Sequence, residues 1–435
     1  MKYPRRRLAV GRQVDLTVSR PIQHDNLEGV ATISDDWRDA TLGEFVALQR
    51  GHDLTEPERA IGRVPVMGSA GQNGFHDTAL AKGPGIVIGR SGASFGQVHY
   101  SSTDYWPHNT ALYVTDFKGN DPRFAFYFLK LIDFSRYNSG SAQPSLNRNF
   151  IYPIPVRIPP LAEQKRIAHI LGTLDDKIEL NRRMNATLEA MARALFQSWF
   201  VDFDPVRAKM DGRRPAGLDK DTAALFPSTF KDSSLGPIPQ GWEVGSILRQ
   251  ADLLSGGTPR TDVPAYWGGD VPWASAKDVS QCGEAFLVTT ERMITRLGVD
   301  ESSTKIIPTL STVVVARGAT TGRLTLLANS MAMNQTCYAL SSQLGTPFVL
   351  YCNARHFIER LVQGGHGSIF DTITTSTFEA TNVLLAPKEI LLAFDEQVAP
   401  LFHQIRASLY QSRTLANLRD MLLPKLLSGE VSNRS

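Results

Sequence analysis

Apolar residues recur at three- and four-residue intervals over about 40 residues after Pro159-Pro160, which is the spacing of one face of a long helix. The positions are Ile167, Leu171, Leu174, Ile178, Leu188, Met191 and Leu195. A similar stretch runs from about Glu389 to Leu427 and contains Pro400 and Pro424. Neither helix can bury so long a stripe alone, so we expect the two to pair as an antiparallel coiled coil.

The chain repeats itself at long period. The segments that begin at Gly140-Ser141 and Gly367-Ser368 run in parallel without a gap, at an offset of 227 residues. Upstream the match is looser, with Trp37, Leu48 and Gly51 spaced as are Trp242, Leu253 and Gly256. Each half therefore reads as a globular module followed by a helix.

Within each module, short apolar runs are broken by Gly, Pro, Asn and Ser. Ile86–Ile88 and Val313–Val315 have the length of buried strands and run into glycine-rich turns. Helical spacing is confined to residues 124–132 and 347–362. We predict an α+β chain with two β-rich domains, separated by two long helices and related by a pseudo-two-fold repeat. The predicted segments are an arm (1–36), a first domain (37–158), a central helix (159–203), a linker laid over the surface (204–240), a second domain (241–386) and a C-terminal helix (387–430).

Composition narrows the class of protein. The 435 residues, 42% of them hydrophobic, suffice for two or three cores. A net charge of +3, from 46 basic and 43 acidic residues, excludes a polycation, so contact with nucleic acid would depend on local faces. Three cysteines spaced too far apart for a zinc ribbon, together with the lack of an apolar run long enough for a membrane span, favour a soluble cytoplasmic protein.

Catalytic motifs are missing from the sequence. The loop Gly89–Gly96 is followed by Gln97-Val98, without the lysine and hydroxyl of a phosphate-binding loop. No Pro-Asp dipeptide accompanies the acid-x-Lys triplets of the chain, and the two on the central helix, Glu163-Gln164-Lys165 and Asp175-Asp176-Lys177, read as solvated charge. The Asn-Pro-Pro-Tyr motif of base methylation is also absent. These features favour a binding protein with neither catalytic nor metal-binding residues.

Three motifs carry a family resemblance. They are Pro159-Pro160-Leu161-Ala162-Glu163-Gln164-Lys165-Arg166-Ile167, Leu174-Asp175-Asp176-Lys177-Ile178-Glu179-Leu180-Asn181, and Leu195-Phe196-Gln197-Ser198-Trp199-Phe200-Val201-Asp202-Phe203-Asp204-Pro205. They resemble the central conserved region of the specificity subunit of type I restriction-modification systems. The linker's Leu235–Trp242 is similar to that family's entry into its second domain. The C-terminal helix departs from the pattern, with Ala386-Pro387-Lys388-Glu389 at its start.

The resemblance implies two target recognition domains, each reading one half of a split double-stranded DNA sequence. It also implies two modification subunits, which methylate adenine with S-adenosylmethionine, and optional restriction subunits that use ATP and Mg2+, in a system of phage defence. On this view the chain itself holds no cofactor. The alternative is a structural adaptor in which the coiled coil is the working part and the domains bind protein or RNA.

Base readout in the major groove uses Arg for guanine and Asn or Gln for adenine, displayed on loops beside the phosphates. The turn-rich stretches supply two sets of such residues as candidates for DNA binding. The first domain offers Gln72, Asn73, Arg90, Ser91, Asn109, Gln143, Asn147 and Arg148; the second offers Arg260, Lys277, Arg317, Arg323, Asn334, Gln335 and Gln363. Arg90 stands two residues before Gly92 whereas Arg317 stands directly before Gly318, so we expect the paired loops to differ in detail.

Overall fold

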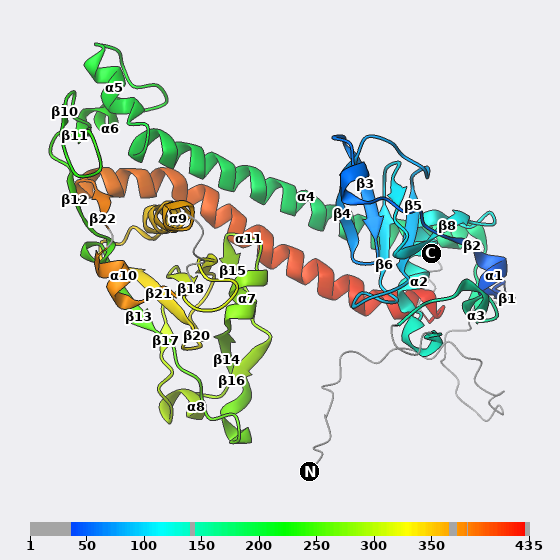
Figure 1. Cartoon of the computed structure of the whole chain (residues 1–435). Helices are drawn as coiled ribbons and strands as arrows, with labels where there is room; N and C mark the ends of the chain where they lie inside the picture. Colours follow the sequence, from blue (N-terminus) through cyan, green and yellow to red (C-terminus); the bar gives the residue numbers. More distant parts are fainter. Residues whose placement is uncertain (1–35, 140–143, 365–371, 381, 431–435) are drawn as a thin grey trace. The chain divides into compact units, whose positions relative to one another are not determined.

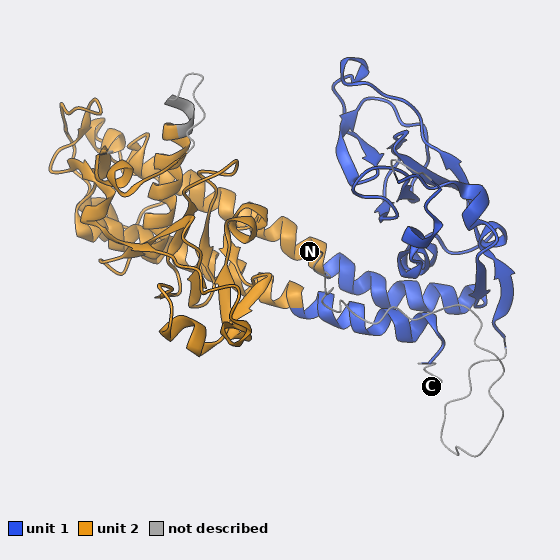
Figure 2. Cartoon of the chain, turned by 60° about the horizontal axis from the view of Figure 1, so that its bottom comes forward, with its two compact units in different colours: residues 1–177, 414–435 blue, residues 178–413 orange. Residues whose placement is uncertain are grey.

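The computed structural model describes residues 36–139, 144–364, 372–380 and 382–430 (Figure 1). The chain divides into two compact units, residues 1–177 with 414–435 and residues 178–413 (Figure 2). In the described part of the chain, we find no helix with the length and apolar character needed to cross a membrane. The expected β-rich modules and long helices are confirmed, and each unit is described below by itself.

Unit 1 contains the first β-rich domain and one end of each long helix. Its strands form a pair ordered β1-β9, a four-stranded sheet ordered β2-β8-β5-β6 and a three-stranded sheet ordered β4-β3-β7. The elements are β1 (Arg38–Thr41), α1 (Leu42–Phe45), β2 (Ala47–Arg50), η1 (Glu56–Glu58), β3 (Val64–Gly68), β4 (Gly71–His76), β5 (Gly85–Gly89), β6 (Val98–Ser101), β7 (Trp106–Pro107), β8 (Ala111–Asp116), α2 (Pro122–Leu131), η2 (Phe134–Tyr137), α3 (Arg148–Ile151) and β9 (Pro155–Ile158).

Unit 2 contains the second β-rich domain and the segment that precedes it. Its main sheets are ordered β13-β21-β18-β19-β15 and β16-β14-β20-β17. The elements are α5 (Asp204–Met210), α6 (Lys220–Leu225), β10 (Phe230–Lys231), β11 (Ile238–Pro239), β12 (Glu243–Ser246), η3 (Ile247–Arg249), β13 (Ala251–Ser255), η4 (Pro264–Tyr266), β14 (Trp267–Ala274), α7 (Ala276–Gln281), β15 (Phe286–Leu287), β16 (Arg292–Ile294), α8 (Arg296–Asp300), β17 (Ile306–Ile307), β18 (Thr312–Val315), β19 (Leu324–Leu327), β20 (Met331–Met333), β21 (Cys337–Ser342), α9 (Pro347–Gly364), α10 (Thr375–Ala380) and β22 (Asn382–Leu385).

The two long helices are α4 (Leu161–Phe200) and α11 (Lys388–Leu427), each of 40 residues. Helix α4 begins directly after Pro160, whose carbonyl accepts the N–H groups of the first turn. The helices run antiparallel in unit 2, where Asn181 of α4 donates to the carbonyl of Ser408 on α11 and Phe200 packs on Phe394. In unit 1, Asp175 of α4 binds Arg419 of α11. The expected antiparallel pairing is therefore confirmed.

The centre of this helix pair differs from the apolar stripe that the sequence predicts. Met191 is 49% exposed, whereas Asn181 and Asn185 are fully buried. The buried Ser408 of α11 faces Asn181. The helical period of the sequence is confirmed, but between Ile178 and Leu188 the side chains that point into the helix pair are polar rather than apolar.

Three further details correct the sequence-based expectations. Residues 204–240 form a small folded segment with buried residues such as Val206 and Phe226, rather than a linker laid over the surface. Asp175 is half-buried and accepts a hydrogen bond from the Tyr127 hydroxyl, so it is not a solvated charge. Asp176 is bound by Arg123 of α2 at 2.6 and 2.9 Å. These carboxylates tie the first domain to the helices.

The internal repeat is visible in the backbone. In unit 1, β1 pairs antiparallel with β9, matching Arg38 with Ile158. In unit 2, β12 pairs antiparallel with β22, matching Glu243 with Leu385. Each pair closes its domain where the chain enters and leaves it, next to a buried tryptophan. The parallel pairing of β3 with β7 likewise has its counterpart in that of β14 with β20.

Candidate DNA-reading loops

In the first domain, the glycine-rich loop follows the buried strand β5 and folds back on its end. The N–H of Gly89 donates to the carbonyl of Gln97 at 2.7 Å, and the N–H of Gly96 donates to the carbonyl of Gly89 at 2.8 Å. Gly92 and Gly96 have positive φ angles of 84° and 78°, which glycine adopts without strain. The sequence of this turn therefore fixes its shape.

The second domain builds the same loop after β18. The N–H of Val315 donates to the carbonyl of Arg323 at 2.8 Å, and the N–H of Gly322 donates to the carbonyl of Val315 at 2.9 Å. Gly318 and Gly322 again have positive φ angles, 97° and 87°. The two loops thus share their backbone at an offset of 226 residues, although the arginine lies one position later in the second. The expected difference in detail therefore lies in the side chains and not in the backbone.

In each domain, the residues just before a strand lie against the glycine-rich loop: Thr110 precedes β8 in the first domain, and Thr336 precedes β21 in the second. The N–H of Arg90 donates to the carbonyl of Thr110 at 2.8 Å, and the equivalent N–H of Ala316 donates to the carbonyl of Thr336 at 2.8 Å. The backbone of Gly51 lies so close to His108 that a Cβ on Gly51 would be 2.2 Å from the carbonyl oxygen of His108. A Cβ on its counterpart, Gly256, would lie 2.1 Å from the carbonyl oxygen of Asn334.

In the first domain, these segments bring four polar side chains together. The Nδ2 of Asn109 donates a hydrogen bond to the Asp53 carboxylate, and Arg50 lies 3.8 Å from the same carboxylate. Arg90 donates from Nε to the carbonyl of Asn109 at 3.2 Å. Partial burial of the Arg90 guanidinium, with a smaller contribution from Arg50, lowers its pKa. The predicted residues Arg90 and Asn109 are thus adjacent.

The other predicted residues of the first domain fall into two groups. Gln72 and Asn73 are exposed on β4. Ser91 is half-buried and forms an isolated β-bridge with Ser145. Asn147 and Arg148 have structural contacts: Asn147 caps α3, and Arg148 donates to the carbonyl of Leu48 at 2.9 Å. Gln143 lies outside the described residues.

In the second domain, the predicted residues are more dispersed. Arg317 and Arg323 are exposed on the loop. Gln335 is hydrogen-bonded to Thr258 across the same junction that joins Asn109 to Asp53.

The remaining four members of the second set have other surroundings. Asn334 accepts the hydroxyl of Thr336 at 2.8 Å. Arg260 pairs with Asp262 at 2.7 Å, and Lys277 pairs with Glu291 at 2.6 Å, so each cation already has an acidic partner. Gln363 lies in the last turn of α9, and its side chain is outside what the structure describes.

Sequence reasoning missed Arg50, Asp53 and Thr258. Asp53 and Thr258 each stand two residues after the glycine that lies against the loop segment, Gly51 or Gly256. The repeat had already aligned these glycines, so the residues that follow them could have been found. Both were overlooked because the search began from the arginine, asparagine and glutamine side chains that pair with base edges.

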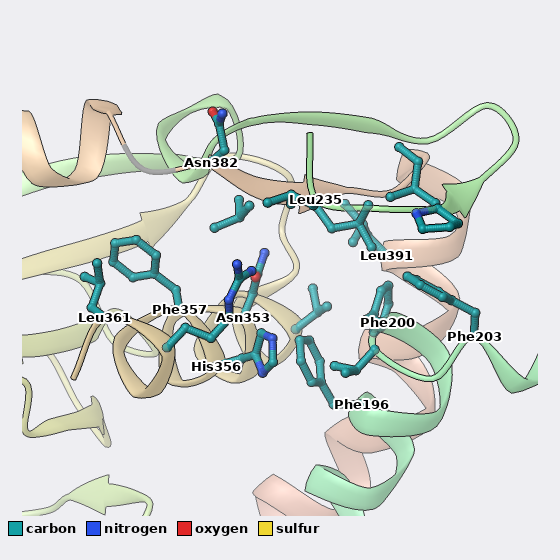
Figure 3. A pocket seen from close by; sticks show the side chains of 17 residues that line it. Phe196, Phe200, Phe203, Leu235, Asn353, His356, Phe357, Leu361, Asn382 and Leu391 are labelled. Atoms are coloured by element: carbon teal, nitrogen blue, oxygen red, sulfur yellow. The ribbon is translucent and has the colours of Figure 1, made fainter. Parts of the chain in front are cut away.

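Two other kinds of candidate site, a metal cluster and an apolar cavity, do not involve these loops. In the described residues, no group of three or more His, Cys, Asp and Glu side chains could hold a metal ion. A cavity of about 280 Å3 in unit 2 lies between the end of α4, α9 and the segment before β12, lined by aromatic and aliphatic side chains with His356 and Asn353 (Figure 3). None of the predicted DNA-binding residues lines it.

The fold is that of two repeated β-rich domains, each in a unit that contains one end of the two long helices. The chain belongs to the family described as the type I restriction modification DNA specificity domain, whose model matches residues 34–190 and 239–413. It is 28% identical over 349 residues to the HindI specificity subunit of Haemophilus influenzae, covering 70% of this chain and 74% of that protein. It is 25% identical over 319 residues to the MjaIX specificity subunit of Methanocaldococcus jannaschii, covering 71% and 68%.

Solved structures agree with the fold. The S subunit of a type I restriction-modification system from M. genitalium matches with a TM-score of 0.57 at 13% identity. The match covers 93% of this chain and 98% of that one. The architecture predicted from the repeat is therefore shared with a solved member of the family, and the alternative of a structural adaptor finds no support among these relatives.

Proposed function

We propose that this chain is the DNA-specificity subunit of a type I restriction-modification complex. Each β-rich domain reads one half of a bipartite double-stranded target, and the chain itself has a targeting role rather than a catalytic one. The observation that carries the proposal is the pair of loops with the same backbone and different side chains. Two such loops suit two half-sites of different sequence, because the backbone positions the readers and the side chains select the bases.

The long helices supply the second part of the role. Several of their large apolar residues face outward instead of into the helix pair: Leu161, Leu180, Met191, Leu392, Tyr410, Leu418 and Met421. Exposed apolar residues in such number on two helices suit a protein partner. We assign these residues, in each unit by itself, to contact with two modification subunits, which would bring S-adenosylmethionine. Restriction subunits with ATP and Mg2+ would join the same complex, which we place in the cytoplasm.

Exchange of one domain tests the proposal. Residues 37–158 are replaced by the matching segment of another specificity subunit, and the complex with its modification subunits is assayed on a library of methylation targets. Because the first domain has its own loop and sheets, we expect one half of the target to change and the other half to stay. A change in both halves, or methylation without sequence preference, would refute independent reading by the two domains.

The length of the helices gives a second test. A helix of 40 residues is a rod of about 60 Å, and one turn of DNA spans about 34 Å, so the half-sites should be separated by a non-specified gap on the order of one turn. Deleting seven residues from each helix should change the gap or abolish binding while both half-site sequences persist. Altered half-sites at an unaltered gap would contradict this geometry.

A further inference from the structure

The hydrogen bond between Asp53 and Asn109 has a direction that chemistry dictates. An ionised carboxylate only accepts hydrogen bonds, so the amide of Asn109 must present its nitrogen to Asp53. Its oxygen, Oδ1, is thereby turned to the opposite side. The second N–H of the same amide remains available. Asp53 thus selects one of the two orientations that an asparagine amide can adopt.

The backbone of Asn109 is held as firmly as its side chain. Its N–H donates to the carbonyl of His52 at 2.9 Å, and its carbonyl accepts from Arg90 at 3.2 Å. A Cβ on Gly51 would clash with the neighbouring carbonyl of His108, so this close approach requires glycine there. Hydrogen bonds of its backbone and of its side chain therefore together preorganise the amide of Asn109.

An acidic residue beside DNA would ordinarily be repelled by the phosphates. Here the Asp53 carboxylate is accompanied by the guanidinium groups of Arg50, at 3.8 Å, and of Arg90, which is bound to Asn109. Two cations accompany one anion, so the cluster as a whole stays positive. The Asp53 side chain is 74% exposed, which leaves the pair open to a ligand.

We propose that Asp53 is a positioning residue that sets the amide of Asn109 to read an adenine in the first half-site. Asparagine recognises adenine by accepting from N6 and donating to N7, which needs one amide oxygen and one N–H on the same side. The orientation fixed by Asp53 leaves Oδ1 and one N–H available. The inference rests on the proposed function and names one base within it.

The second domain provides an internal comparison. At the equivalent junction Thr258 faces Gln335, and a hydroxyl both donates and accepts, so it does not fix the amide of Gln335 in one orientation. Ser255 and Ala316 occupy the positions of Arg50 and Arg90. The second domain therefore lacks this charged cluster on the same backbone. Positioning of an amide by an acidic residue is therefore expected in the first domain alone.

The experiment uses the full chain in complex with its modification subunits and a library of duplexes randomised in both half-sites. Asp53→Asn replaces the obligate acceptor by an amide that can also donate, so the orientation of Asn109 is released. We expect the preference for adenine at one position of the first half-site to fall about tenfold, or about 1.4 kcal/mol. All other positions, the second half-site and the melting temperature should be unchanged.

Matched variants separate this effect from a general one. Asp53→Glu keeps the carboxylate and should restore part of the preference. Asp39→Asn removes another exposed carboxylate, from the β1–β9 pair, where it contacts Arg157, and should change no base preference. If Asp53→Asn leaves selectivity intact, weakens all duplexes equally or alters a base other than adenine, the inference is wrong. A wild-type complex without sequence preference would instead contradict the proposed function.

Discussion

Asn181 of α4 donates a hydrogen bond from Nδ2 to the carbonyl oxygen of Ser408 on α11 at 3.3 Å, and these residues are 227 positions apart, the offset of the internal repeat. Equivalent residues of the two halves therefore touch, which gives the helix pair local two-fold symmetry at this point. The same nitrogen lies 2.9 Å from Oε1 of Gln411 and 3.1 Å from Oγ of Ser412. A polar residue at such a position fixes the alignment of paired helices at a cost in stability.

Asn181→Leu should stabilise the protein. Asn181 is fully buried, and its Oδ1 has no hydrogen-bond partner among the described residues. Leucine removes this unpaired acceptor and adds apolar contact, whereas Gln411 is exposed and can bind water instead. We expect the free energy of unfolding in urea to rise by about 1–2 kcal/mol.

Asn181→Asp is the matched control, because it places a charge at the same buried site and should lower the free energy of unfolding by about 3 kcal/mol. A leucine variant as unstable as the aspartate variant would show that the hydrogen bonds of Asn181 outweigh the unpaired oxygen.

Gly172→Ala should destabilise unit 1, although alanine normally stabilises the interior of a helix by about 0.5–1 kcal/mol over glycine. A Cβ at Gly172 would lie 2.6 Å from Cζ of Arg123, which lies over this turn of α4 and donates to the carbonyl of Gly172 at 3.0 Å. Moving Arg123 also breaks its two bonds to Asp176. We expect a net loss of about 1 kcal/mol in thermal or urea unfolding.

A double-mutant cycle checks the cause of that loss. In an Arg123→Ala background the obstacle is absent, so Gly172→Ala should regain its ordinary stabilising sign. If the alanine destabilises equally in both backgrounds, crowding by Arg123 is not the cause.

The repeat, the long helices and the buried strands could be predicted because each depends on local spacing. The strand at Val313–Val315 and the helix after Pro160 follow from runs of a few residues. The buried polar centre at Asn181 could not be predicted, because its inward position depends on what the opposite helix offers. The folded segment around Phe226 was missed for a similar reason: it is organised by distant aromatic residues such as Trp199 and Trp242.

The candidate site was only partly accessible from sequence. Arg90 and Asn109 were chosen for their chemistry and do lie together. Asp53 contacts Asn109, which is 56 positions away in the sequence, and no local pattern reveals such a contact. Conversely, Asn147 and Arg148 have suitable chemistry, but the structure uses the first as a helix cap and the second as a donor to a backbone carbonyl.

The pH dependence of stability should contain a contribution from Asp395. This residue of α11 is buried, and its Oδ1 accepts the N–H groups of Phe348 and Val349, in the first turn of α9, at 2.8 and 2.9 Å. Burial raises its pKa from 3.8 to about 6, against the opposing effect of these two bonds. Because the folded protein holds the proton more tightly than the unfolded chain, this contribution is present below pH 3.8 and is lost as the pH rises through about 6.

Asp395→Asn removes the charge and keeps an acceptor at Oδ1, so it should remove this part of the pH dependence and raise the melting temperature above pH 6 relative to wild type. Asp395→Ala loses both bonds to α9 and should lower the melting temperature at every pH. Melting curves measured across this range decide between these outcomes. An asparagine variant with the wild-type pH profile would show that Asp395 does not titrate there.

Arg317 and Arg90 should respond differently to truncation, although both follow a buried strand and stand beside the glycine-rich loop. Arg90 is half-buried and bound to the carbonyl of Asn109, so Arg90→Ala should lower the melting temperature as well as alter the first half-site. Arg317 is exposed and makes no side-chain hydrogen bond or ion pair with another described residue. Its truncation should leave the melting temperature unchanged.

For Arg317 we therefore expect an effect on DNA recognition without an effect on the stability of the protein. If it pairs with a guanine of the second half-site, Arg317→Ala costs about 1–3 kcal/mol at that one position and relaxes it, as measured by methylation of a half-site library. Arg317→Lys keeps the charge but cannot form the bidentate hydrogen bonds that arginine makes with guanine. It should therefore relax the same position while retaining most of the salt dependence of binding. Were both variants to weaken every duplex alike with base preference intact, Arg317 would be a phosphate contact, and reading by the second domain would have to depend on Gln335 and Arg323.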